Sequence, residues 1–109
     1  MKEILFAQST PNGTIKGVLR IVHTKIFFKY NDSQMARNVI EEYRKKGVKV
    51  TFSSKNDWIM VEPFEGFELI KLRDKELDIK ESTVEETEQF LIDFYESEYK
   101  RLGYHTELI

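Results

Sequence analysis

The chain has 109 residues, a length typical of one folded domain, so we expect a single domain over residues 1–109. Hydrophobic residues make up 40% of it and charged residues 33%, which is too apolar for a disordered chain and too charged for a membrane span. The absence of cysteine excludes disulfides, a thiol nucleophile and thiolate metal sites. With only two histidines and no secretory or membrane signal, we expect a cytoplasmic protein without a metal or a cofactor.

The net charge of −2 hides an uneven distribution along the chain. Residues 1–60 contain 11 Lys and Arg against 5 Asp and Glu, whereas residues 61–109 contain 6 against 14. Residue types with AT-rich codons (Phe, Tyr, Met, Ile, Asn and Lys) number 42, and those with GC-rich codons (Gly, Ala, Arg and Pro) number 14. This composition favours an AT-rich source, such as a low-GC bacterium, its phage or a mobile element.

The N-terminal part of the chain is predicted to be β-structure. Two apolar runs at residues 3–9 and 14–22 flank Asn12-Gly13, a strong hairpin signal. Residues 25–30 then place Ile26, Phe28 and Tyr30 on one face, which continues the even-numbered positions of the preceding run, including Val18 and Val22. This segment is either a third strand or the far end of one long bent strand.

The middle of the chain predicts a helix followed by two hairpins. Residues 32–46 have helical periodicity, with Asn31 and Gln34 at capping-box spacing and Gly47 as the stop. Alternation and turn residues predict strands at 48–53 and 58–62, with Trp58 packed in the core, and then at 67–72 and 76–80.

Ser82 and Glu85 form a second capping-box pattern, which opens a helix over residues 83–102. Its predicted inner face is Val84, Thr87, Phe90, Leu91, Phe94, Tyr95 and Leu102. The expected fold is α+β: an antiparallel sheet of five to six strands built from hairpins, with two amphipathic helices packed on one face as a two-layer sandwich.

Enzyme motifs for phosphate loops, dinucleotides, zinc proteases and serine hydrolases are absent from the sequence. The triplet Asp78-Ile79-Lys80 resembles the half-motif of PD-(D/E)xK nucleases, with Asp57 and Glu62 as further carboxylates. That resemblance implies Mg²⁺ held by two carboxylates, with Lys80 beside the attacking water. The same triplet is also what the solvated side of an ordinary alternating strand contains.

The basic N-terminal part suggests a nucleic-acid binder as an alternative. The order helix, three strands, helix over residues 32–102 resembles a double-stranded-RNA-binding domain, but Glu85, Glu86 and Glu88 make the start of the last helix acidic where that family needs a basic one. Solvated i,i+4 pairs account for part of the basic cluster equally well. The candidate contacts are Lys16, Arg20, Lys25, Lys29, Arg37, Arg44, Lys45 and Lys46.

The acidic last helix leads to the main functional hypothesis. From Glu81 to Glu98 there are seven acidic residues and no basic one, a surface of one sign that could attract a basic partner. We therefore expect a small non-catalytic protein that binds another macromolecule, most simply a protein, as a phage or mobile-element regulator or inhibitor. No membrane is expected as a partner. An edge strand at the N-terminal hairpin or in the tail, residues 104–109, could build a homodimer. The candidate contact residues are Glu85, Glu88, Asp93, Glu96 and Glu98.

Overall fold

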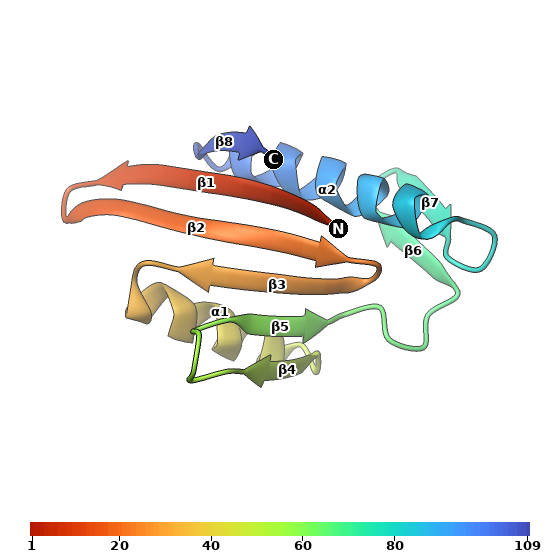
Figure 1. Ribbon diagram of the computed structural model, residues 1–109, viewed down its shortest axis with the longest axis horizontal. Coiled ribbons are helices and arrows are strands. Elements are labelled where there is room, and N and C mark those ends of the chain that lie inside the picture. Colours follow the sequence, from red (N-terminus) through yellow and green to blue (C-terminus); the bar gives the residue numbers. More distant parts are fainter.

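The computed structural model describes residues 1–109 and shows the expected α+β fold, with a six-stranded antiparallel sheet, a separate hairpin and two helices packed against the sheet (Figure 1). The order of strands in the sheet is β4-β5-β3-β2-β1-β8, and β6 pairs with β7. The elements are β1 (Lys2–Thr10), β2 (Gly13–Val22), β3 (Lys25–Tyr30), α1 (Ser33–Lys45), β4 (Lys49–Phe52), β5 (Ile59–Glu62), β6 (Leu69–Leu72), β7 (Lys75–Asp78), α2 (Val84–Arg101) and β8 (His105–Leu108).

The segment 25–30 is a separate third strand rather than the end of a bent one. The chain reverses at His23 and Thr24, where His23 has a positive φ of 55°, and Ile21 of β2 then lies opposite Ile26 of β3. Because the turn has two residues, the core positions change from odd on β2 to even on β3. Val18 and Val22 therefore lie on the opposite face from Ile26, and the expectation that they share one face is wrong.

One face of the sheet forms most of the core. Its side chains come from the four central strands and are at most 2% exposed: Ile4, Phe6, Leu19, Ile21, Ile26, Phe28, Ile59 and Val61. Helix α2 adds Leu91 and Ile92, and the β6–β7 hairpin adds Ile70. Both helices pack on this inner face, since Phe28 contacts Tyr43 of α1 and Tyr95 of α2.

The N-cap of helix α1 lies one residue later in the chain than the predicted one, Asn31. Asp32 is the N-cap, and its carboxylate accepts a hydrogen bond from the N–H of Met35 at 2.9 Å. The Asn31 side chain instead accepts from the N–H of Lys16 and donates to the carbonyl of Thr14, so it ties the helix start to β2. The capping box of Asn31 and Gln34 is therefore not formed.

Helix α2 is capped by Thr83 and Glu86 rather than by Ser82 and Glu85. The Thr83 hydroxyl accepts from the N–H of Glu86 at 3.0 Å, and the Glu86 carboxylate accepts from the N–H of Thr83 at 2.9 Å. The hydrogen bond from the backbone N–H of Thr83 holds the pKa of Glu86 below its usual value.

This cap can be tested by substitution. Thr83→Ala is expected to lower the free energy of unfolding by about 1 kcal/mol, because the first turn of α2 loses a side-chain acceptor. Urea denaturation followed by circular dichroism measures the change. Thr83→Ser keeps the hydroxyl and should unfold like the wild type, and equal losses in both variants would argue against the cap.

The buried face of α2 differs in part from the predicted one. Thr87, Glu88, Leu91 and Ile92 are buried, whereas Val84 and Leu102 are more than half exposed. Val84 and Leu102 point away from the sheet, so these two apolar side chains at the ends of the helix remain accessible.

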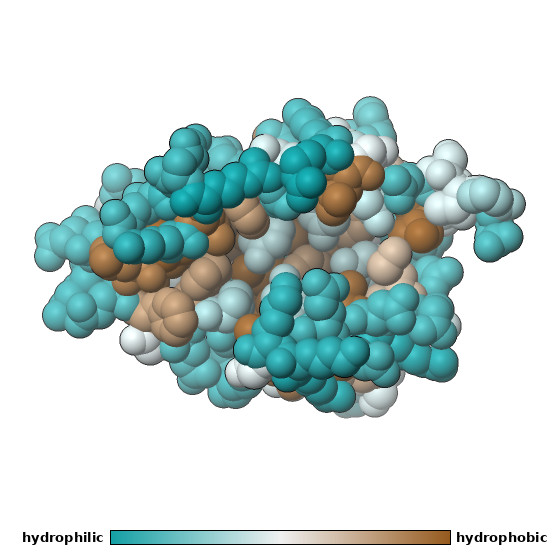
Figure 2. Space-filling model, turned by 180° about the vertical axis from the view of Figure 1, so that it is seen from behind, coloured by the Kyte–Doolittle hydropathy of each residue, from teal (hydrophilic) through white to brown (hydrophobic).

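A groove of about 350 Å³ separates the two helices. Figure 2, seen from the helix side, shows apolar groups on its floor between the two polar helices. Phe28 lies beneath it, and Tyr43, Tyr95 and Tyr99 line it. Burial raises the pKa of these three tyrosines, so their hydroxyls remain protonated at neutral pH.

The free edges of the sheet are the four-residue strands β4 and β8. The N-terminal hairpin is an edge only at its tip, because β8 pairs with β1 from Ile4 to Ala7 and leaves residues 8–10 of β1 uncovered. A homodimer through an edge strand stays a prediction, with β8 and β4 as the strands that could extend the sheet. Neither helix is both long enough and apolar enough to cross a membrane.

Candidate nucleic-acid interface

The four residues of the nuclease hypothesis do not come together. Glu62 is the last residue of β5, whereas Asp57 lies in the loop before that strand. Asp78 is on the separate hairpin, where its carboxylate accepts from the N–H groups of Lys80 and Glu81. No group of three His, Asp or Glu side chains is placed to hold one metal ion. Asp57, Glu62, Asp78 and Lys80 therefore do not form the convergent set that the resemblance implied.

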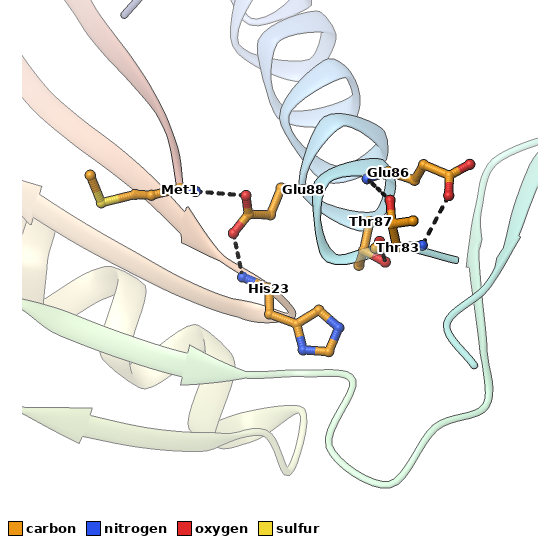
Figure 3. A network of polar contacts seen from close by, with 6 residues as sticks. All are labelled: Met1, His23, Thr83, Glu86, Thr87 and Glu88. Atoms are coloured by element: carbon orange, nitrogen blue, oxygen red, sulfur yellow. Dashed lines mark hydrogen bonds and ion pairs between the residues drawn. The ribbon is translucent and has the colours of Figure 1, made fainter. Parts of the chain in front are cut away.

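Glu88 is not part of an exposed acidic surface. It is 4% exposed, and its carboxylate accepts from the Met1 ammonium at 2.7 Å and from the His23 backbone N–H at 2.8 Å (Figure 3). Burial alone would raise its pKa, but these two hydrogen bonds outweigh burial and hold the pKa below its usual value. Glu88 fixes α2 to the start of β1 and to the β2–β3 turn, and it is inaccessible to a partner.

Two other acidic residues of α2 have cationic partners within the chain. Glu98 is paired with Arg73 and Arg101, and Glu96 is paired with Lys100. Glu85 and Asp93 are exposed and make no ion pair; Asp93 accepts a hydrogen bond from Gln89. Of the five residues predicted to form an acidic contact surface, only these two are both exposed and free of ion pairs.

The basic residues divide into two groups on opposite sides of the sheet. Lys16, Arg20, Lys25 and Lys29 alternate with core residues of β2 and β3, so they share the outer face, which neither helix covers. In Figure 1 the outer face points toward the viewer, and α1 lies behind the sheet. The other four residues are on or just after α1, on the helix side: Arg37, Arg44, Lys45 and Lys46.

Trp58 lies on this outer face, just before β5, and the expectation that it packs in the core is wrong. Ile59 and Val61 of β5 point inward, so Trp58 and Met60 point outward. The Trp58 ring is edge-on to Phe27 at 6.4 Å, with the Arg20 guanidinium 4.6 Å and the Lys29 ammonium 5.7 Å from the ring centroid. These are cation–π distances.

Most, but not all, of the cations on this face are compensated by carboxylates. Arg20 contacts Glu3 at 2.6 Å, whereas Lys25 and Lys49 both approach Glu62, at 4.0 and 3.3 Å. Hydrogen bonding and attraction to Glu62 raise the pKa of Lys49. Lys16 and Lys29 have no acidic partner, so their charges are available to an anion.

Two hollows lie side by side on the outer face. The first, of about 490 Å³, has the apolar side chains of Leu5, Ala7 and Val18 together with Lys16 and Lys29, and His105 and Glu107 of β8 line its other side. The second, of about 370 Å³, is lined by Arg20, Phe27, Thr51, Ser53, Asn56, Trp58 and Met60. Together they form a shallow surface with apolar floors and mostly cationic borders, on which Glu107 is the one carboxylate.

The cations of this face are among the contacts that the sequence indicates, whereas Trp58 and Met60 are not. Their strand reads Trp58-Ile59-Met60-Val61, in which both alternating sets are apolar, so the sequence does not indicate which set faces the core. The β-branched residues at 59 and 61 are the only available signal, and they are the ones that pack inward. No protein-family model, curated protein or solved structure matches this chain.

Proposed function

We propose that this protein binds single-stranded nucleic acid on the outer face of its six-stranded sheet. The observation that carries the proposal is the common placement of Lys16, Arg20, Lys25 and Lys29 on the same face as Trp58 and Phe27, a face that no helix covers, with Arg20 and Lys29 against the Trp58 ring. Proteins that bind single strands combine a cationic surface for the phosphates with aromatic side chains on which bases stack. Both components are present here within neighbouring strands.

The placement of charge in the fold supports this function despite the net charge of −2. Strands β1 to β5 come almost entirely from the basic first 60 residues, whereas α2 and the β6–β7 hairpin come from the acidic remainder. Since α2 lies on the inner face, a strand bound to the outer face meets the basic part of the protein.

The protein-binding role expected from the acidic helix has less support. That role needs an uncompensated acidic surface, and only Glu85 and Asp93 of the five candidate residues are exposed without a cationic partner. A role as regulator or inhibitor remains compatible with nucleic-acid binding, because occupation of a strand by a small protein can block other proteins from it.

Binding can be measured by fluorescence anisotropy with labelled oligo(dT) and oligo(rU) of about 12 nucleotides, a length within the usual site sizes. We expect affinity to fall at least tenfold between about 50 and 200 mM salt, because phosphate contacts release counterions. Trp58→Leu should weaken binding about tenfold, since one stacked base contributes roughly 1–3 kcal/mol.

The matched control is Arg44→Ala with Lys45→Ala, which removes two cations from α1 on the helix side. This control should bind like the wild type. No binding by the wild type at low salt contradicts the proposed function. Equal losses in the Trp58 variant and the α1 control would show that binding does not use the outer face.

A further inference from the structure

Lys16 and Lys29 are neighbours on the outer face. Lys29 of β3 is opposite Val18 of β2, and Lys16 precedes Val18 by two residues, so the two lysines occupy diagonal positions on adjacent strands. Side chains at such positions start about 7–8 Å apart. Since each lysine has a flexible four-carbon stem, both ammonium groups can reach the same small anion.

These two lysines are the uncompensated cations of the face. Glu3 pairs with Arg20, and Glu62 pairs with Lys25 and Lys49, but neither Lys16 nor Lys29 forms an ion pair. Two ammonium groups that reach toward the same point repel each other. An anion held between them removes this repulsion, so the pair favours one shared negative group.

The two hollows meet at Lys29. Lys29 lines the hollow with Leu5 and Val18, and its ammonium also lies 5.7 Å from the ring of Trp58, which lines the other hollow. An anion held by Lys29 and Lys16 would therefore have an apolar recess on one side and an aromatic ring on the other. A phosphodiester with a base on each side has this arrangement of charge and apolar surface.

We propose that these residues form a dinucleotide subsite, in which Lys16 and Lys29 hold one phosphodiester between them. One of the flanking bases packs in the hollow of Leu5 and Val18, and the other packs against Trp58. This subsite rests on the proposed function and adds a position and a spacing to it. It predicts that the two lysines act on one phosphate and therefore act together.

The test compares Lys16→Ala, Lys29→Ala and the double variant with the same oligo(dT) and oligo(rU) probes. Each single variant should weaken binding about tenfold, because a hydrogen bond to a charged group contributes roughly 1.5 kcal/mol or more. The double variant should lose little more affinity than either single variant, because each single substitution already breaks the shared contact with the phosphate. Lys25→Ala combined with Lys29→Ala serves as the control pair, and its losses should multiply because Lys25 is outside both hollows.

Each outcome has a defined meaning. If the fold-losses in affinity of Lys16→Ala and Lys29→Ala multiply in the double variant, as in the control pair, the two lysines do not share one phosphate. That result overturns the subsite but leaves the proposed function intact. Wild-type binding without any effect of Lys16 or Lys29 overturns the subsite as well. No binding by the wild type overturns both proposals, and a preference for one probe shows whether the strand is DNA or RNA.

Discussion

Replacing Gly17 with alanine is expected to lower the free energy of unfolding by about 3 kcal/mol, the upper part of the range for overpacking a core. A Cβ atom at this position would lie 2.3 Å from the ring of Phe6 and 2.8 Å from the backbone carbonyl oxygen of Lys29. Phe6 cannot move aside freely, because its ring is stacked on Tyr99 at 4.2 Å and is edge-on to Tyr30 and Tyr104. The carbonyl cannot move without disturbing the pairing of β2 with β3.

Chemical denaturation of the wild type and of Gly17→Ala measures this effect. Adding Phe6→Leu to Gly17→Ala should recover part of the loss, because a smaller side chain leaves room for the new Cβ, so the two changes should be less than additive. Lys16→Ala, at the adjacent exposed position, should change the free energy of unfolding by no more than about 0.5 kcal/mol. Wild-type stability of Gly17→Ala would contradict the close packing of Phe6 over Gly17.

Replacing Glu88 with glutamine is expected to lower the free energy of unfolding by about 2 kcal/mol at pH 7. The neutral amide can still accept a hydrogen bond from His23, but its NH₂ group cannot satisfy the Met1 ammonium, so one side of the network loses its partner. The loss is moderate because the Met1 side of the pair is 56% exposed and solvent screens it.

The effect of this substitution should depend on pH. The pKa of Glu88 is lower in the folded protein than its usual value of 4.5, so the carboxylate contributes stability that is complete above that value and is lost as pH falls through the folded pKa. The difference between wild type and Glu88→Gln should therefore be constant from about pH 6 to 7 and shrink below pH 4.5. Denaturation curves across this range measure it.

Glu85→Gln is the matched control, because Glu85 is exposed one turn earlier on the same helix and forms no ion pair. It should change the free energy of unfolding by no more than about 0.5 kcal/mol at any of these pH values. Equal effects of the two substitutions would indicate that general charge on α2, rather than the buried contact of Glu88, determines the stability.

The candidate sites show why charge runs in a sequence are weak guides to function. Seven acidic residues from Glu81 to Glu98 suggest one acidic surface, yet Glu88 binds the chain's own Met1 and Glu98 binds Arg73 of the β6–β7 hairpin. These partners are 87 and 25 residues away in the sequence, so no local pattern indicates them. The outer-face cations are among the contacts that the sequence indicates, but even-numbered alternation carried through His23 places Arg20 and Lys25 on opposite faces. Only the two-residue β2–β3 turn brings them to one face.

The sequence by itself determined the local structure of this protein. Turn residues and alternation placed β1 to β7, and helical periodicity placed both helices to within one residue at each end, because these signals depend on interactions between residues close in the chain. The tail that forms β8 was the exception, since its sequence is compatible with a strand or with an unpaired segment. The α+β fold followed from the order of these elements.

Only the tertiary structure decided which faces and charges remain accessible. Trp58 and Val18 lie on apolar alternating strands, and the register set by the β2–β3 turn and the β3–β5 pairing determines that they face outward. In the same way, packing of α2 against the sheet brings Glu88 to Met1. On the outer face, Glu3 and Glu62 pair with other cations, so Lys16 and Lys29 form no ion pair. The physical reason is that strand register and charge pairing depend on contacts between distant segments, whose geometry exists only in the folded chain.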